Sequence, residues 1–178
     1  TDADAYGDLY QWGRAADGHE KLNSDTYDGT SVRPNTNTES GTWDGKFITL
    51  PNGTNRDDWI TTKTDNAWNT GTTVNPIKTA TDPCPSGYRL PTATEFNNEV
   101  SSFGSLNLAG AYASVLKLPA TGSRSYGSGS INPPGGSGNY WSSTVSGDYS
   151  RSLGFNNNSA SVGTSNRGFG LSVRCIKD

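Results

Sequence analysis

The chain has few apolar and few charged residues: of its 178 residues, 30% are hydrophobic and 17% are charged. Low hydrophobicity combined with high net charge and few aromatics is typical of disordered chains. The net charge here is only −3, however, and the chain contains 5 Trp, 8 Tyr and 5 Phe, which bury a large area per residue. We therefore expect one folded, loop-rich domain over residues 1–178, with a core that depends on aromatic side chains.

Other absences exclude classes of partner. No apolar run reaches about 18 residues, so we expect no membrane insertion. The 14 Lys and Arg are spread along a chain with a pI of about 5.1, which offers no basic patch, so we expect no nucleic-acid partner. No signal peptide is visible, and the sequence begins at Thr1 without Met, which is consistent with a removed leader or tag.

Groups that perform catalysis are also scarce. The one histidine, His19, lies beside Glu20 in a polar stretch, and we expect it to be structural or solvated. No Ser-His-Asp or paired-carboxylate arrangement can be argued, so no catalytic residue is predicted and we expect no enzyme. The Gly-rich loop 127–138 lacks a following Lys-Ser/Thr, so it is not a phosphate loop.

No cofactor and no metal site are predicted. Asp25 and the run Asn55-Arg56-Asp57-Asp58 offer oxygen ligands that suit calcium, so a structural calcium ion stays open. A solvated loop is the simpler interpretation of these residues.

The two cysteines, Cys84 and Cys175, lie 91 positions apart. They fit one disulfide, two buried thiols or a reactive thiol. We expect the disulfide, with a Cα separation below about 7 Å, and an extracytoplasmic or virion setting.

The first half of the chain predicts little regular structure. Residues 1–20 suggest a strand or short helical segment that docks aromatics onto the core. Residues 21–82 predict a long irregular region with Gly, Asn, Thr and Pro between isolated apolar anchors. These anchors are Trp43, Phe47, Ile48, Trp59, Ile60 and Trp68.

Two short helices are expected next. Thr92 followed three residues later by Glu95 is a capping box, which predicts a helix over about 93–102. This helix should bury three apolar side chains: Phe96, Val100 and Phe103. Residues 106–118 predict a short helix or turn that enters a strand at 115–118.

The last third predicts an antiparallel meander with a small, polar outer face. Its first strand starts at Tyr140–Thr144. Alternation of apolar and small residues then predicts three strands: one with Leu153 and Phe155, one with Ala160 and Val162, and one with Leu171, Val173 and Cys175 on its inner face. Turn signals lie at 156–158 and 163–166. The predicted class is α+β, with small antiparallel sheets, about two short helices and much irregular loop.

Five motifs, in order, resemble one known family. They are Tyr6–Arg14 (YGDLYQWGR), Cys84–Thr92 (CPSGYRLPT), Leu116–Gly122 (LKLPATG), Tyr140–Thr144 (YWSST) and Ser172–Cys175 (SVRC). Together they resemble the Fibrobacter succinogenes major paralogous domain family, which is similar to the formylglycine-generating-enzyme branch of the C-type lectin fold. The resemblance covers nearly the whole chain and implies a C-type-lectin-like fold.

Some members of that family are similar to the variable proteins of diversity-generating retroelements, in which a reverse transcriptase randomises adenine-derived codons at the 3′ end of the gene. The resemblance implies that residues 140–175 are the variable, ligand-binding region. The implied scaffold positions are Tyr140, Trp141, Ser142, Ser143, Thr144, Leu153, Phe155, Arg167, Gly170, Val173, Arg174 and Cys175. The implied variable positions are Val145, Ser146, Asp148, Tyr149, Arg151, Ser152, Gly154, Asn156, Ser161, Gly163, Thr164, Ser165, Gly168 and Phe169.

The composition of this region agrees with such a role, because half of residues 140–175 are Ser, Gly or Asn. With Tyr, these types supply rigid area and adaptable hydrogen bonds in antibody paratopes. Phe169 stays ambiguous, since its parity with Leu171 and Val173 favours the core while the family pattern makes it variable.

The resulting hypothesis is a non-enzymatic, hypervariable ligand-binding protein, outside the cell, on its surface or on a virion, that binds a protein or glycan of a cell surface in receptor binding or adhesion. The alternative is a static adhesion or glycan-binding module of the same fold that uses Trp43, Trp59 or Trp68. The chain has none of the Glu-Pro-Asn, Gln-Pro-Asp or Trp-Asn-Asp strings of sugar-binding C-type lectins. A third hypothesis, an oxidase, would need reactive cysteines close together.

Overall fold

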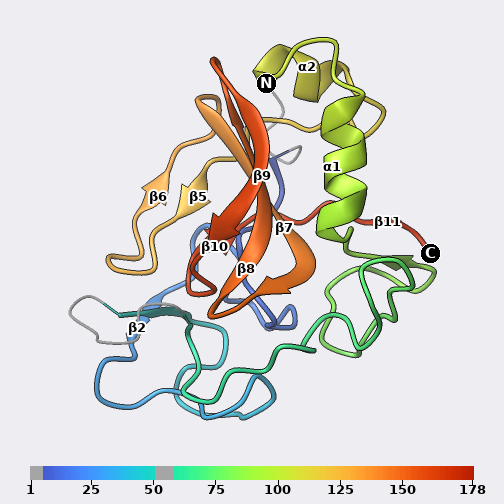
Figure 1. Cartoon of the computed structure of the whole chain (residues 1–178). Coiled ribbons are helices and arrows are strands. Elements are labelled where there is room, and N and C mark those ends of the chain that lie inside the picture. Colours follow the sequence, from blue (N-terminus) through green and yellow to red (C-terminus); the bar gives the residue numbers. More distant parts are fainter. Residues whose placement is uncertain (1–5, 51–57) are drawn as a thin grey trace.

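The computed structural model describes residues 6–50 and 58–178, and in this part of the chain two short helices and four small sheets are linked by long irregular segments (Figure 1). The α+β class predicted from the sequence is therefore confirmed. The helices are α1 (Ala93–Ser101) and α2 (Leu108–Ala113). The strands are β1 (Tyr10–Gln11), β2 (Thr26–Asp28), β3 (Phe47–Thr49), β4 (Tyr88–Arg89), β5 (Ser123–Arg124), β6 (Ile131–Asn132), β7 (Ser137–Ser146), β8 (Tyr149–Asn156), β9 (Ala160–Ser165), β10 (Gly170–Leu171) and β11 (Ile176–Lys177).

The longest strands, β7, β8 and β9, form the antiparallel meander that the alternation predicted. The pairing of β8 with β9 is regular from Ser150–Ser165 to Phe155–Ala160. The predicted turn at 163–166 is wrong by a few residues, because β9 continues to Ser165 and its residues pair across to β8. Pairing in the other sheets is also antiparallel, except that β2 and β3 pair in parallel.

Helix α1 stands beside this meander (Figure 1) and closes the first part of the core. Its predicted capping box is present: the Thr92 hydroxyl accepts the N–H of Glu95, and the Glu95 carboxylate accepts the N–H of Thr92 at 2.8 Å. The buried side of α1 packs against β7, β8 and β9 in a cluster of Phe96, Phe103, Ala111, Leu118, Tyr140, Leu153, Phe155 and Ala160. The predicted burial of Phe96 and Phe103 is confirmed, and Val100 is partly buried against the same cluster.

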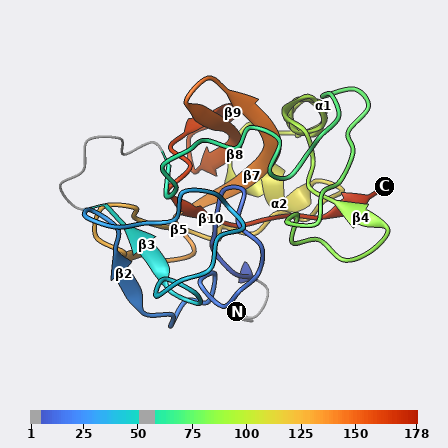
Figure 2. The same cartoon turned by 90° about the horizontal axis from the view of Figure 1, so that it is seen from below.

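Tryptophans form the rest of the core. Trp12, Trp68 and Trp141 pack with Leu90 and Leu171 on the other side of the meander. Trp43, Ile48, Trp59 and Ile60 make a third cluster. It lies toward β2 and β3, which are on the opposite side of the molecule from α1 (Figure 2).

Buried indole N–H groups tie distant segments together. Trp12 donates to the carbonyl of Ser142, Trp141 to that of Tyr10 and Trp59 to that of Trp12, at 2.7–2.9 Å. The aromatic core expected from the composition is therefore confirmed, and its hydrogen bonds place the N-terminal segment against β7.

Two predicted strands differ in the structure. Residues 115–118 form a turn, in which Val115 is 87% exposed, Lys117 has a φ of 51° and Leu118 donates its N–H to Ala111 at the end of α2. The predicted last strand is wrong beyond its first residues, because Val173 and Cys175 lie in no strand. Leu171 belongs to β10, which pairs with β1 and β5, whereas Ile176 and Lys177 pair with β4 in another sheet.

After Leu171 the main chain of Ser172 bonds to β7, through both its N–H and its carbonyl. It accepts the N–H of Trp141 and donates its own N–H to Asn139. Cys175 then reaches Cys84, with a Cα separation of 5.7 Å, and the predicted disulfide is confirmed. This bond is favoured by a non-reducing environment. Within the described residues, neither helix is long and apolar enough to cross a bilayer.

We predict that the double substitution Cys84→Ser and Cys175→Ser lowers the free energy of unfolding by about 4 kcal/mol, because the disulfide closes a long loop in the unfolded chain. Urea denaturation followed by tryptophan fluorescence measures this difference. The wild-type protein with and without reductant is the matched comparison. Equal midpoints for the oxidised and reduced protein would contradict the prediction.

Candidate functional site

Cross-strand pairing divides the predicted variable positions between the two faces of the meander. Residues that pair directly share a face, and so do alternate residues along a strand. The face that carries Leu153 and Phe155 therefore also carries four candidates toward the β7–β8 turn, which we call the tip residues: Ser146, Tyr149, Arg151 and Thr164. The opposite face carries Val145, Ser152, Gly154, Asn156, Ser161, Gly163 and Ser165. Asp148 lies in the β7–β8 turn, and Gly168 and Phe169 follow β9.

Exposure divides the same positions again. Six are exposed: Asp148, Tyr149, Asn156, Ser161, Gly163 and Thr164. Six are half-buried: Val145, Ser146, Arg151, Gly154, Ser165 and Phe169. Ser152 and Gly168 are buried, and the Ser152 hydroxyl bonds to that of Ser165 at 2.8 Å. Neither Ser152 nor Gly168 offers contact area to a partner in this structure.

Phe169 was predicted either as a core residue or as a variable residue, and its contacts favour the core. Its ring meets that of Tyr126 edge-on at a centroid distance of 4.6 Å, and it packs against the cluster of Trp12 and Trp141. Such aromatic contacts stabilise beyond simple area burial.

Arg167 holds the β7–β8 turn from beneath. The residue is fully buried, and its guanidinium lies over the Trp12 ring at 4.7 Å. Its Nη2 donates to the main-chain carbonyls of Gly147 and Tyr149 at 3.2 and 3.4 Å, and lies 2.6 Å from the Asp65 carboxylate. Arg167 therefore holds the turn through its main chain.

The small hydroxyl residues of β7 also bond to the main chain of neighbouring segments. The register between β7 and β8 shifts between Trp141 and Val145, so residues 142–144 lie opposite Arg151 alone. The Ser142 hydroxyl donates to the Arg151 carbonyl at 2.9 Å. Ser143 donates its N–H to the Pro91 carbonyl, and the Thr144 hydroxyl accepts the N–H of Ala93, so the bulge is fastened to the start of α1.

The turn also contacts a segment to which the sequence assigned no function. Lys63 forms an ion pair with Asp148 at 2.6 Å, and this hydrogen bond lowers the pKa of Asp148 below its ordinary value. Lys63 and Asp65 lie about 80 positions before the turn, in a stretch with no periodic pattern, so no local signal in the sequence could have paired them with it.

Asp58 is a buried carboxylate beside Arg167. It is 2% exposed, and its Oδ2 lies 3.6 Å from Arg167 Nη1. Burial raises the pKa of Asp58 to about 7, although the charge of Arg167 opposes this. Of the residues suggested for calcium, Asn55, Arg56 and Asp57 lie outside the described residues, Asp25 is exposed, and Asp58 already faces a guanidinium.

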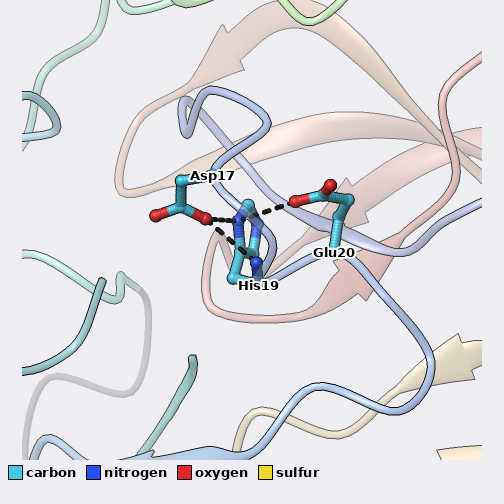
Figure 3. Close-up of side chains that lie close together, drawn as sticks. All are labelled: Asp17, His19 and Glu20. Atoms are coloured by element: carbon cyan, nitrogen blue, oxygen red, sulfur yellow. Dashed lines mark hydrogen bonds and ion pairs between the residues drawn. The ribbon is translucent and has the colours of Figure 1, made fainter. Parts of the chain in front are cut away.

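Within residues 6–50 and 58–178, one group of side chains is close enough to hold a metal ion: Asp17, His19 and Glu20 (Figure 3). His19 is fully buried, and its Nδ1 lies 2.6 Å from Asp17 Oδ1 while its Nε2 accepts the N–H of Gln11 at 3.1 Å. A carboxylate only accepts, so Nδ1 carries the proton and neither ring nitrogen has a lone pair for a metal. Of the two roles expected for His19, structural or solvated, its complete burial and two hydrogen bonds favour the first.

Comparison of the chain with protein-family models found no match, and comparisons with curated proteins and with solved structures found none either.

We predict that Arg167→Met lowers the free energy of unfolding by about 3–5 kcal/mol, because it removes one partner of a buried ion pair and leaves carbonyls unpaired. Urea denaturation at neutral pH measures the loss, and amide hydrogen exchange at residues 147–149 should accelerate. The control is Arg174→Met, since Arg174 is exposed; its effect should stay within about 0.5 kcal/mol. Equal losses in both variants would contradict the anchoring role.

We predict that the free energy of unfolding changes with pH in opposite directions in the variants Asp58→Asn and His19→Gln. Burial lowers the pKa of His19 to about 4, so between pH 6.5 and 4 the unfolded state takes up a proton that the folded state refuses, and stability falls as the pH falls. The raised pKa of Asp58 acts in reverse, because the folded state keeps a proton that the unfolded state releases as the pH rises from about 4 to 7.

Asp58→Asn should therefore gain stability from pH 4 to 7, by about 3 kcal/mol if His19 acts alone. His19→Gln should lose stability over the same range. Urea denaturation at a series of pH values checks both slopes, with the wild type between them. Parallel slopes in the two variants would be the contrary result.

Proposed function

We propose that the chain is a non-enzymatic ligand-binding protein with a C-type-lectin-like fold, whose C-terminal region is diversified to bind proteins or glycans of cell surfaces. The observation that supports this most directly is the way the β7–β8 turn is held. Arg167 and Ser142 bond to the carbonyls of Gly147, Tyr149 and Arg151. Side chains at Tyr149 and Arg151 are therefore replaceable without loss of these bonds.

The tip residues have the chemistry of a recognition surface. Tyr149 is 41% exposed and shares its face with Arg151. Tyr and Arg dominate binding energy at many interfaces, and the hydroxyls of Ser146 and Thr164 supply adaptable hydrogen bonds. The disulfide supports a setting outside the reducing cytosol. It engages both cysteines of the chain, so no free thiol remains.

One observation favours the static glycan-binding alternative. Trp43 and Trp59 line a cavity of about 300 Å³ together with Asp17, Glu39 and Asp44. These two side chains are only 8% and 2% exposed, however, and Trp68 belongs to the separate cluster of Trp12. Buried rings offer a ligand little contact area, so the tip residues are the better-supported binding surface.

We predict that the triple substitution Tyr149→Ser, Arg151→Ser and Thr164→Asn changes the free energy of unfolding by less than about 1 kcal/mol, because these side chains lie outside the core. The control on the same strand, Leu153→Ala, should cost about 2–5 kcal/mol through the cavity it leaves. Urea denaturation compares the two. The triple variant should also lose binding to a panel of intact bacterial cells, measured by flow cytometry. Retained cell binding, or unfolding as severe as in the control, would overturn the proposal.

The DNA beside the gene separates a diversified protein from a static one. A near-repeat of the 3′ end that differs only at adenines, next to a reverse transcriptase gene, is expected for the diversified protein. Flanking sequence without it would leave the static module.

A further inference from the structure

A pocket of about 320 Å³ adjoins the variable region, between the loop of residues 65–73 and the bulge of β7. We call it the loop pocket. Its lining includes Asp65, Asn66, Asn69 and Thr73 from the loop and Thr144 and Val145 from β7. One wall therefore comes from a segment outside the predicted variable region, and the other includes the candidate position Val145.

The loop that forms the first wall is organised before any ligand arrives. Asn69 Oδ1 accepts the N–H groups of Gly71 and Ile77 at 2.8 Å, and its Nδ2 donates to the Thr72 carbonyl at 3.3 Å. Trp68 anchors the base of the loop, since it is 1% exposed and donates its indole N–H to the Thr81 carbonyl at 2.9 Å. A loop held in this way loses little conformational entropy on binding.

Several polar groups of the loop pocket have no protein partner. Among the described residues, none forms a hydrogen bond with the side chain of Asn66 or with the hydroxyl of Thr73. Asp65 bonds Arg167 through Oδ1 alone, and its side chain is 64% exposed. The pocket thus offers an amide, hydroxyls and a carboxylate oxygen side by side.

The lining contains no Lys, Arg or aromatic residue. The one charged side chain of the lining, Asp65, is already paired with Arg167, so the loop pocket presents no unpaired charge to attract an anionic or a basic ligand. Groups that both donate and accept hydrogen bonds, such as the hydroxyls of a sugar, match the amide and hydroxyl lining best.

We propose that the loop pocket binds a neutral, hydroxyl-rich sugar residue of a cell-surface glycan. The inference rests on the proposed function and adds the ligand class. The fixed wall supplies hydrogen bonds common to many sugars, while Val145 and the tip residues adjust which glycan is preferred. Its volume lies at the small end of ligand pockets, which suits a short ligand.

The test uses a glycan microarray that carries neutral, sialylated and sulfated oligosaccharides. The wild-type protein should bind neutral glycans. Asn66→Ala should reduce that signal at least tenfold and Thr73→Val should reduce it less, because the first removes a donor and an acceptor and the second removes one hydroxyl. The matched control is Asn97→Ala on α1, an exposed Asn outside the pocket lining, which should leave binding unchanged. Circular dichroism confirms that each variant is folded.

No binding to neutral glycans, binding to acidic glycans alone, or equal signals from Asn66→Ala and Asn97→Ala would each overturn the proposal. The pair Tyr149→Ser and Arg151→Ser on the same array separates it from the proposed function. If this pair leaves glycan preference unchanged while Asn66→Ala abolishes binding, the result supports the loop pocket and contradicts the proposed binding role of the tip residues. If the pair abolishes cell binding while Asn66→Ala has no effect, the result supports the binding role of the tip residues and contradicts the sugar site in the loop pocket.

Discussion

The buried guanidinium of Arg167 is the interaction on which the C-terminal half of the molecule depends. It lies over Trp12, which comes from the N-terminal segment, and it bonds Asp65 from the middle of the chain and two carbonyls of the β7–β8 turn. A charge that is fully buried is costly unless it is paired, so these partners must stay together. Three segments that are distant in sequence are thereby fixed at one point beneath the turn.

The sequence predicted the local elements well, because their signals are local. The capping box of Thr92 and Glu95 marked the start of α1, and the alternation around Leu153 and Phe155 marked β8. Long-range pairing decided what the pattern could not. Val115 to Leu118 look like a strand, but they form a turn whose Leu118 N–H bonds to Ala111 of α2. Leu171 to Cys175 look like one strand, but the strand ends at Leu171, Ser172 bonds to β7, and residues 173–175 lie in no strand.

The candidate site was predicted in part. Its chain segment follows from the resemblance and from the small polar composition, and the pairing of β7, β8 and β9 brings the tip residues together. What the sequence could not show is which neighbours face them. Ser152 and Ser161 look alike in a list of small residues, yet the first is buried against Ser165 and the second is exposed. Lys63 and Asp65 carry no motif and reach the turn only through the fold.

The Cys84–Cys175 bond has a consequence for chemical durability. The chain contains no methionine, and both of its cysteines are in this bond. Thiols and thioethers are the side chains that peroxides attack first, and here neither group remains. Peroxides therefore find no free thiol and no thioether in this chain to oxidise.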